Sequence, residues 1–280
     1  WMFVFGNLGV SAMGAPGAGL ASMLATTAGC FYFVWQTSKA KVFAKFSIHP
    51  GSFFRVFHRN LDNEKDSGAL AILRLSWPVA AQTFFVLAGF TLFMAMMKAV
   101  GTIEVAASNV IITILSFSFM PGFGIGIAAS TLIGQKLGAG LPEEASAVGW
   151  EAQKIGMLMM SLLGLVFIIL PEQLIMLFTD NAEVIGVASW PLMLLGAFQV
   201  FDALCMTTYG CLEGAGLTIF TMWTELLVNW GFFIPFTWIS IHVFDSGIRM
   251  PFVGMAIYLV LYSAILQWKF WQGDWKQTKI

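Results

Sequence analysis

Long runs of apolar residues follow one another along this chain, separated by short polar stretches. An α-helix needs about 20 apolar residues to cross the hydrocarbon core of a bilayer, because each residue advances the helix by about 1.5 Å. Backbone groups in lipid must also be hydrogen-bonded within their own segment. The pattern therefore predicts an all-α polytopic membrane protein with about seven transmembrane helices, at 17–37, 75–97, 105–135, 155–171, 184–212, 217–241 and 250–268.

Basic residues fall almost entirely on one side of these seven runs. If successive runs cross in opposite directions, one side collects twelve of the 14 Lys and Arg residues, and the other has only Lys98 and Arg249. Cytoplasmic loops of membrane proteins are enriched in Lys and Arg. The distribution predicts that the basic face and the C-terminus lie in the cytoplasm, in a plasma membrane or a bacterial inner membrane.

Composition agrees with a membrane setting and argues against several classes of protein. Hydrophobic residues make up 58% of the chain and charged residues 10%, against about 25% charged residues in a soluble domain. A net charge of −1 and the lack of a basic, aromatic-rich stripe give no sign of a nucleic-acid partner. The three cysteines and three histidines match no disulfide or metal-ligand spacing. We therefore expect no enzyme and no cofactor.

The polar stretches divide the chain into four parts. Residues 1–37 hold the end of one helix and one full span, and 38–74 form a basic loop. Residues 75–271 hold six spans, and 272–280 form a cytoplasmic tail. Within the loop, aromatic and basic residues alternate at 53–59. This patch predicts either a helix lying on the membrane surface or a solvated linker with a few buried aromatic side chains.

A glycine-rich motif follows the third run. Residues 134–145 read Gly-Gln-Lys-Leu-Gly-Ala-Gly-Leu-Pro-Glu-Glu-Ala. This segment resembles the "Gly-Gln-x-x-Gly-Ala-Gly-x-Pro-x-x-Ala" loop of the multidrug and toxic compound extrusion (MATE) family. Leu-Ser-Trp-Pro at 75–78, Ala-Ala-Ser-Asn at 106–109 and the Gly-rich turn at 210–218 are similar to further family segments in the same order.

The resemblance implies twelve helices in two six-helix lobes. On that analogy the chain holds the last helix of the first lobe and a complete second lobe, so the rest of the N-terminal lobe is an expected partner. The apolar start at Trp1, without a leader-like charged region, also suggests a piece of a longer protein. The implied function is export of organic, often cationic, small molecules through the bilayer, driven by inward flow of H⁺ or Na⁺.

An acid in the middle of the fifth run is the first candidate for ion coupling. Asp202 lies more than a dozen residues from the outer end of its span. An unpaired carboxylate there is costly, so it should face a polar cavity, where it can bind and release a cation. One branch of the family has an acid at this place, and this implies that Asp202 binds H⁺ or Na⁺.

Three other polar residues, Gln82, Asn109 and Glu225, are predicted to take part in ion coupling with Asp202. Glu225 lies in the sixth run, and it either lines the same cavity or extends toward the cytoplasmic interface. Asn229 follows four residues later on the same helix face. In the family's cation-binding branch, a second acid follows the proline equivalent to Pro78. This chain has Gln82 there instead. Coupling is therefore expected to use Asp202 together with Gln82, Asn109 or Glu225. Glu213, at the turn after the fifth run, is expected on a solvated face.

Proline and glycine gather near the end of the third run, at Pro121, Gly122, Gly124 and Gly126. Proline removes a helical hydrogen bond, and glycine permits close helix approach. The cluster predicts either a hinge for alternating access or a static kink packed by a neighbouring helix.

Aromatic residues supply the predicted substrate contacts. The chain has 27 Phe and 11 Trp residues, whose rings can bind organic cations. We expect the cavity to be lined by Phe85, Phe198, Asn229 and Trp230. Other tryptophans are expected in the interfacial belts of the membrane, most clearly Trp35, Trp268, Trp271 and Trp275.

Two alternative functions would require residues that this sequence lacks. A lipid-linked oligosaccharide flippase of the same superfamily should need Arg or Lys in its cavity to hold pyrophosphate, and the seven runs contain neither. A seven-helix receptor matches the number of spans, but the third run lacks Asp-Arg-Tyr at its inner end and the seventh lacks Asn-Pro-x-x-Tyr.

Overall fold

The computed structural model describes residues 2–6, 13–39 and 68–277. Every regular element in these ranges is helical, which agrees with the predicted all-α fold. The chain divides into two units, Trp1–Ala71 and Ile72–Ile280. The patch at 53–59, predicted as an interfacial helix or a linker, lies outside the described residues.

The first unit contains a short helix and a long one, α1 (Met2–Phe5) and α2 (Gly14–Lys39). The amide of Met13 donates a 2.9 Å hydrogen bond to the Phe3 carbonyl, which turns the chain back into α2. The predicted first span lies within α2. α2 is 26 residues long, which is about the length of a transmembrane helix.

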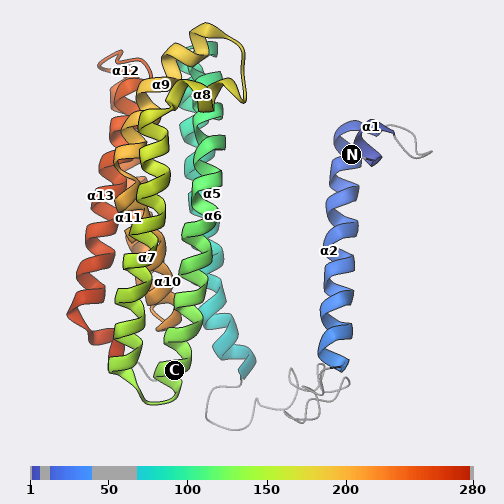
Figure 1. Ribbon diagram of the computed structural model, residues 1–280, viewed down its shortest axis with the longest axis vertical. Coiled ribbons are helices and arrows are strands. Elements are labelled where there is room, and N and C mark those ends of the chain that lie inside the picture. The colour runs from blue at the N-terminus through green and yellow to red at the C-terminus, as the bar shows by residue number, and fades with distance from the viewer. Residues whose placement is uncertain (1, 7–12, 40–67, 278–280) are drawn as a thin grey trace. The chain divides into compact units, whose positions relative to one another are not determined.

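The second unit is a bundle of long helices (Figure 1). Five helices have the length and composition of membrane spans, and a bent pair makes a sixth. The helices are α5 (Gly68–Val100), α6 (Thr102–Gly138), α7 (Pro142–Ile169), α8 (Pro171–Met176), α9 (Ala182–Ala197), α10 (Gln199–Gly214), α11 (Thr218–Val228), a π-helical turn η1 (Asn229–Phe233), α12 (Ile234–His242) and α13 (Arg249–Gln272).

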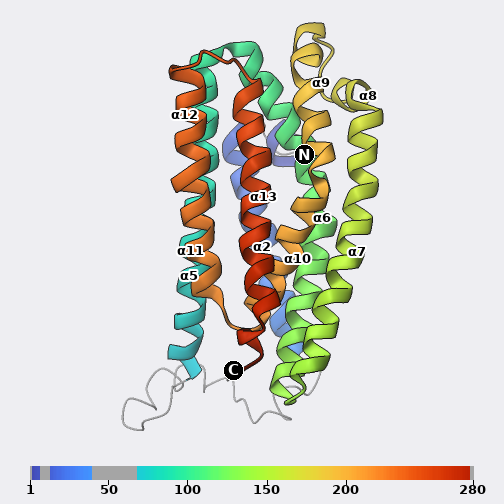
Figure 2. The ribbon, with the colours of Figure 1, turned by 90° about the vertical axis from the view of Figure 1, so that its left-hand side faces the viewer.

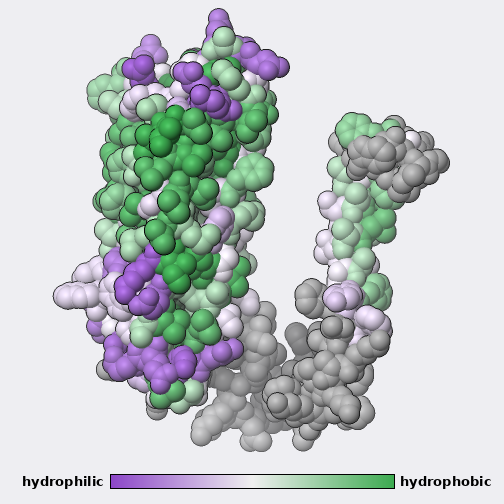
Figure 3. All heavy atoms as spheres, viewed as in Figure 1, coloured by the Kyte–Doolittle hydropathy of each residue, from purple (hydrophilic) through white to green (hydrophobic). Residues whose placement is uncertain are grey.

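The surface of this bundle is that of a protein that faces lipid. Figure 3 shows a wide hydrophobic band between hydrophilic ends on the face in view. Large apolar side chains on this unit point outward, among them Phe117, Ile127, Leu158 and Leu227, each 65–67% exposed. A monomer in water rarely exposes a hydrophobic band of this size, whereas a protein surrounded by hydrocarbon does.

Helices α6, α7, α9 and α10 pack closely, and α13 packs against α9, α10, α11 and α12 (Figure 2). Two clusters of buried apolar side chains result. One is centred on Phe93, Ile111 and Phe252, and the other on Ile133, Leu212 and Leu266. Tyr258 and Leu259 pack against both clusters, so they mark the level at which the two meet.

A series of contacts between small or polar residues joins α6 to α10, and we call it the α6–α10 seam. It consists of Ser118 with Gln199, Gly122 with Met206, Gly126 with Gly210, and Ser130 with Gly214. The contacts repeat every four residues on α6, as expected for ridges that pack into grooves. A Cβ atom at Gly210 or Gly214 would collide with the backbone of α6, so only glycine permits this separation.

Two spans are interrupted near the middle of the bundle. The axes of α9 and α10 differ by 55° across Phe198. In the next span, the amide of Ile234 bonds to the carbonyl of Asn229, five residues earlier, which gives the π-helical turn. Pro235 follows immediately and has no amide to offer the preceding turn, a common cause of such a turn.

The predicted hinge segment lies in an unbroken helix, since α6 runs through Pro121 and ends at Gly138. A Cβ atom at Gly122 would lie 2.7 Å from the Met206 sulfur, and one at Gly126 would lie 2.8 Å from the Met206 carbonyl oxygen. Gly124, in contrast, has nothing within 4 Å. Gly122 and Gly126 therefore pack α6 against α10, and the hinge remains a prediction.

The predicted tail folds back onto the bundle. After the left-handed Gly273, a 3₁₀ turn η2 (Asp274–Gln277) brings Trp275 onto Phe270, with ring centroids 5.0 Å apart. Trp275 is 1% exposed, and its indole N–H donates to the Phe270 carbonyl. The prediction of Trp275 as a belt residue is therefore wrong, whereas Trp271 is 74% exposed. Lys276 pairs with Glu143 of α7 at 3.0 Å.

Candidate functional site

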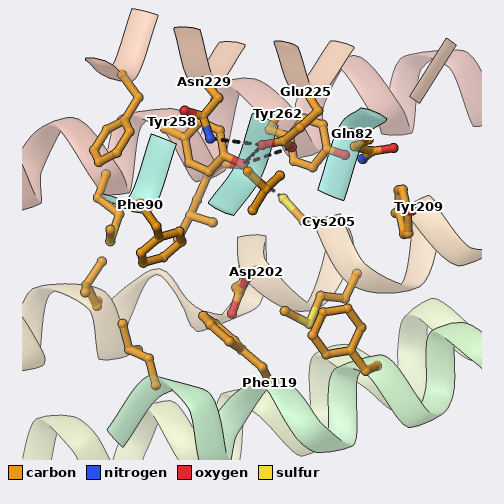
Figure 4. Close-up of a pocket in the computed structure, with 18 of the residues that line it drawn as sticks. Gln82, Phe90, Phe119, Asp202, Cys205, Tyr209, Glu225, Asn229, Tyr258 and Tyr262 are labelled. Atoms are coloured by element: carbon orange, nitrogen blue, oxygen red, sulfur yellow. Dashed lines mark hydrogen bonds between the residues drawn. The ribbon is translucent and has the colours of Figure 1, made fainter. Parts of the chain in front are cut away.

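A cavity of about 410 Å³ lies inside the second unit, between the two buried apolar clusters. Its walls come from α5, α6, α9, α10, α11, η1 and α13 (Figure 4). Two carboxylic acids, Asp202 and Glu225, line it, and its described lining includes no Lys, Arg or His. The cavity is therefore acidic, with otherwise mainly apolar and aromatic walls.

Asp202 enters the cavity from the first turn of α10, directly after the bend at Phe198. Its side chain is buried, with 4% of the residue exposed. The carboxyl oxygen Oδ2 has no hydrogen-bond partner among the described residues. An unsatisfied buried oxygen costs about 1–3 kcal/mol, and more if it is charged. A proton, a cation or water in the cavity would supply the missing partner.

Glu225 lies on the opposite side of the cavity from Asp202 in Figure 4. It is 3% exposed, and two donors, the Tyr258 hydroxyl and the Asn229 amide, hold its carboxyl group. The Tyr258 hydroxyl lies 2.8 and 3.0 Å from its two oxygens, and the Asn229 amide nitrogen lies 3.1 Å from Oε1. The alternative in which Glu225 extends to the interface is therefore wrong.

Two amide side chains add further oxygens to the cavity. Gln82 lies one turn after Pro78 on α5, and Asn229 begins η1. The oxygens Gln82 Oε1 and Asn229 Oδ1 are buried without a partner, as is Asp202 Oδ2. Three of the predicted polar residues thus bring unsatisfied acceptors to the lining of one cavity.

Four other predicted residues do not line the cavity. Asn109 is exposed in the second turn of α6, on a different helix face from the lining residues Leu115 and Phe119. Phe198 lies at the bend and packs against Phe201, 5.8 Å between ring centroids. The remaining two, Phe85 and Trp230, contact each other beside the cavity.

Trp230 and Phe85 have a positioning role in place of the predicted lining role. The indole N–H of Trp230 donates a 3.1 Å hydrogen bond to the Phe85 carbonyl, and the two rings meet edge to face at 6.0 Å. Each is one residue away from a lining residue, Asn229 and Val86 respectively, and so points in a different direction. Together they hold η1 against α5.

Three tyrosines are the functional side chains that sequence reasoning missed. Tyr209, Tyr258 and Tyr262 line the cavity, and they are three of the four tyrosines in the chain. Tyr258 and Tyr262 stack with nearly parallel rings, 5.8 Å apart. Their spacing of four residues on a helix, together with the scarcity of tyrosine in this chain, was the available signal.

Glu213 accepts a hydrogen bond that the sequence did not predict. It is only partly exposed, and it accepts a hydrogen bond from the Tyr209 hydroxyl one turn earlier on α10. Glu213 is therefore partly solvated, and Tyr209 connects it to the cavity wall.

Comparison with known proteins identifies the family to which the chain belongs. The MatE family model matches residues 78–239. A probable multidrug resistance protein NorM from Thermotoga maritima is 27% identical over 280 residues, which is 100% of this chain and 58% of that protein. Its counterpart from Mesorhizobium japonicum is 32% identical over 98% of this chain and 58% of its own length. The chain thus spans little more than half the length of these curated relatives.

Solved structures show the same fold. A multidrug resistance MATE family transporter in an outward-facing conformation aligns with a TM-score of 0.81 at 17% identity, over 99% of this chain and 59% of that one. The eukaryotic MATE transporter AtDTX14 aligns with a TM-score of 0.76 at 21% identity, again over 99% of this chain and 59% of that one. With the family match across more than half of its residues, this chain belongs to the MatE family of membrane transporters.

Proposed function

We propose that this chain provides the cation-binding lobe of a secondary antiporter that exports organic, often cationic, compounds in exchange for H⁺ or Na⁺. The observation that carries the proposal is Asp202: a buried carboxyl group with an unpartnered oxygen at the wall of a half-open cavity. The relatives named as multidrug resistance proteins support the substrate class.

In this mechanism the cavity is reached alternately from each face of the membrane. A cation bound at Asp202 stabilises the conformation that releases substrate outward, and loss of the cation to the cytoplasm resets the protein. Such coupling requires that the ion bind the two conformations with different affinity. The bend at Phe198 lies one turn before Asp202, so changes in ion occupancy act next to an existing break in the helix.

The distribution of basic residues gives the proposed orientation, with the C-terminus in the cytoplasm. The acidic cavity favours a cationic substrate over the pyrophosphate-linked substrate of a flippase. A flippase would be expected to place Arg or Lys near the phosphates, and the described cavity lining has neither.

Gradient-driven export from membrane vesicles tests the proposal. Asp202→Asn should abolish accumulation driven by an imposed H⁺ or Na⁺ gradient, because the amide cannot take up and release a cation. The matched control is Asp180→Asn, which changes an exposed acid in the connection before α9. Undiminished gradient-driven export by Asp202→Asn would remove Asp202 from the mechanism.

A further inference from the structure

The two acids in the cavity have opposite hydrogen-bonding environments. Glu225 receives hydrogen bonds from Tyr258 and Asn229, so donors surround both of its oxygens. Asp202 leaves Oδ2 buried without any partner. Donors that converge on a carboxylate fix its position and partly balance its charge. A carboxyl group without them needs a proton or a cation whenever it is enclosed.

The position of Glu225 depends on a glycine on a different helix. A Cβ atom at Gly89 of α5 would lie 2.6 Å from Asn229 Oδ1 and 3.3 Å from Asn229 Cγ. Only the absence of a side chain at Gly89 therefore leaves room for the Asn229 amide, which in turn donates to Glu225. The Trp230–Phe85 hydrogen bond holds the same turn against α5 from the neighbouring residue.

Aromatic rings lie on the Glu225 side of the cavity. Tyr258 stacks on Tyr262 at 5.8 Å and packs against Phe233 at 5.7 Å, and all three rings line the cavity. A fixed carboxylate beside aromatic faces is the chemistry that recognises a flat organic cation, through charge and cation–π attraction together.

We infer that the two acids have different tasks: Glu225, positioned by Tyr258, Asn229 and Gly89, binds the charged group of a flat organic cation, and Asp202 takes the coupling ion. The inference rests on the proposed transport function and adds a substrate-binding residue to it. Tyr258 and Gly89 act as positioning residues, because they set where the Glu225 carboxyl group lies.

Equilibrium binding separates the two tasks from transport. Ethidium, a flat permanent cation, serves as the probe, and its fluorescence is titrated against purified protein in detergent. Glu225→Gln should weaken ethidium binding about tenfold or more, equivalent to about 1.4 kcal/mol. Glu225→Asp keeps the charge and should recover a substantial part of the affinity. Asp202→Asn should bind ethidium within about threefold of the unaltered protein, yet lose gradient-driven export.

Two alanine substitutions test the positioning. Gly89→Ala should weaken ethidium binding severalfold by displacing the Asn229 amide, and the Ala variant of Gly186, which has nothing within 4 Å of an added Cβ, is the matched control. Size-exclusion profiles confirm that each variant is folded.

Three outcomes would overturn the inference: normal ethidium binding by Glu225→Gln, loss of binding by Asp202→Asn, or no ethidium binding by the unaltered protein. Failure of the proposed function looks different, since the unaltered protein would then bind ethidium without any export that depends on an ion gradient.

Discussion

The hydroxyl group of Tyr258 lies within hydrogen-bond distance of both carboxyl oxygens of Glu225, at 2.8 and 3.0 Å. This contact joins α13 to α11 inside the cavity, across 33 residues of sequence. Neither helix can rotate independently without breaking it. A change in the shape of the cavity therefore either preserves the pair or exposes an acid that has lost its donor.

Removing the Tyr258 hydroxyl should destabilise the protein. Tyr258→Phe leaves the Glu225 carboxyl without its donor from α13, at an expected cost of about 1–3 kcal/mol. Thermal unfolding in detergent measures the loss. In a double-mutant cycle with Glu225→Gln the two costs should not add, because both changes remove the same contact. Strict additivity would show that the pair makes no energetic contribution.

The α6–α10 seam should be intolerant of even a methyl group. Gly210→Ala drives a Cβ atom into the backbone of Gly126, so we expect a cost of about 1–3 kcal/mol from overpacking. Gly138→Ala, where an added Cβ meets nothing within 4 Å, should instead stabilise α6 by about 0.5–1 kcal/mol. If the unfolding midpoints of both variants shift in the same direction, this account of the packing is wrong.

Trp275 should contribute far more to stability than its exposed neighbour. Trp275→Ala removes a buried ring from Phe270, and we expect a loss of about 3–5 kcal/mol, as for other buried aromatic residues. Trp271→Ala changes a side chain that is 74% exposed and should cost less than about 0.5 kcal/mol. Equal effects in a denaturation series would show that Trp275 is not docked in the folded protein.

The ion pair beside Trp275 should matter little. Lys276 and Glu143 lie 3.0 Å apart, but the glutamate side chain is 82% exposed, so solvent screens the attraction. Glu143→Gln should change the free energy of unfolding by less than about 1 kcal/mol, and less still in high salt. A larger effect, or one that persists in molar salt, would mean that the pair is shielded from water.

The parts of this protein that could be predicted from the sequence are those governed by local hydropathy. Long apolar runs predicted most of the helices. Asp202 and Glu225 stood out because each is the single charged residue within such a run, and an acid in hydrocarbon requires a polar environment.

Features that depend on contacts between helices could not be predicted in the same way. Nothing in the sequence around Glu225 shows that Tyr258 is its donor, and the bend at Phe198 has no proline beside it, only Gly196 two residues earlier. Pro121 and its neighbouring glycines allowed either a hinge or a static kink within the third span, and the contacts of Gly122 and Gly126 with Met206 depend on where α10 lies. Trp275 follows a helix end and precedes polar residues, so its burial depends on its contacts with Phe270 and α7, which are distant features of the fold.

The α6–α10 seam also limits how an ion can arrive. Its contacts begin at Gln199 and continue through Met206 and Gly210, so they flank Asp202 along α10. Because the two backbones meet this closely, no opening remains between α6 and α10 through which water could reach Asp202 from the lipid side. An ion proposed to bind Asp202 therefore does not enter between α6 and α10, and it reaches the carboxyl group from the cavity that Asp202 lines.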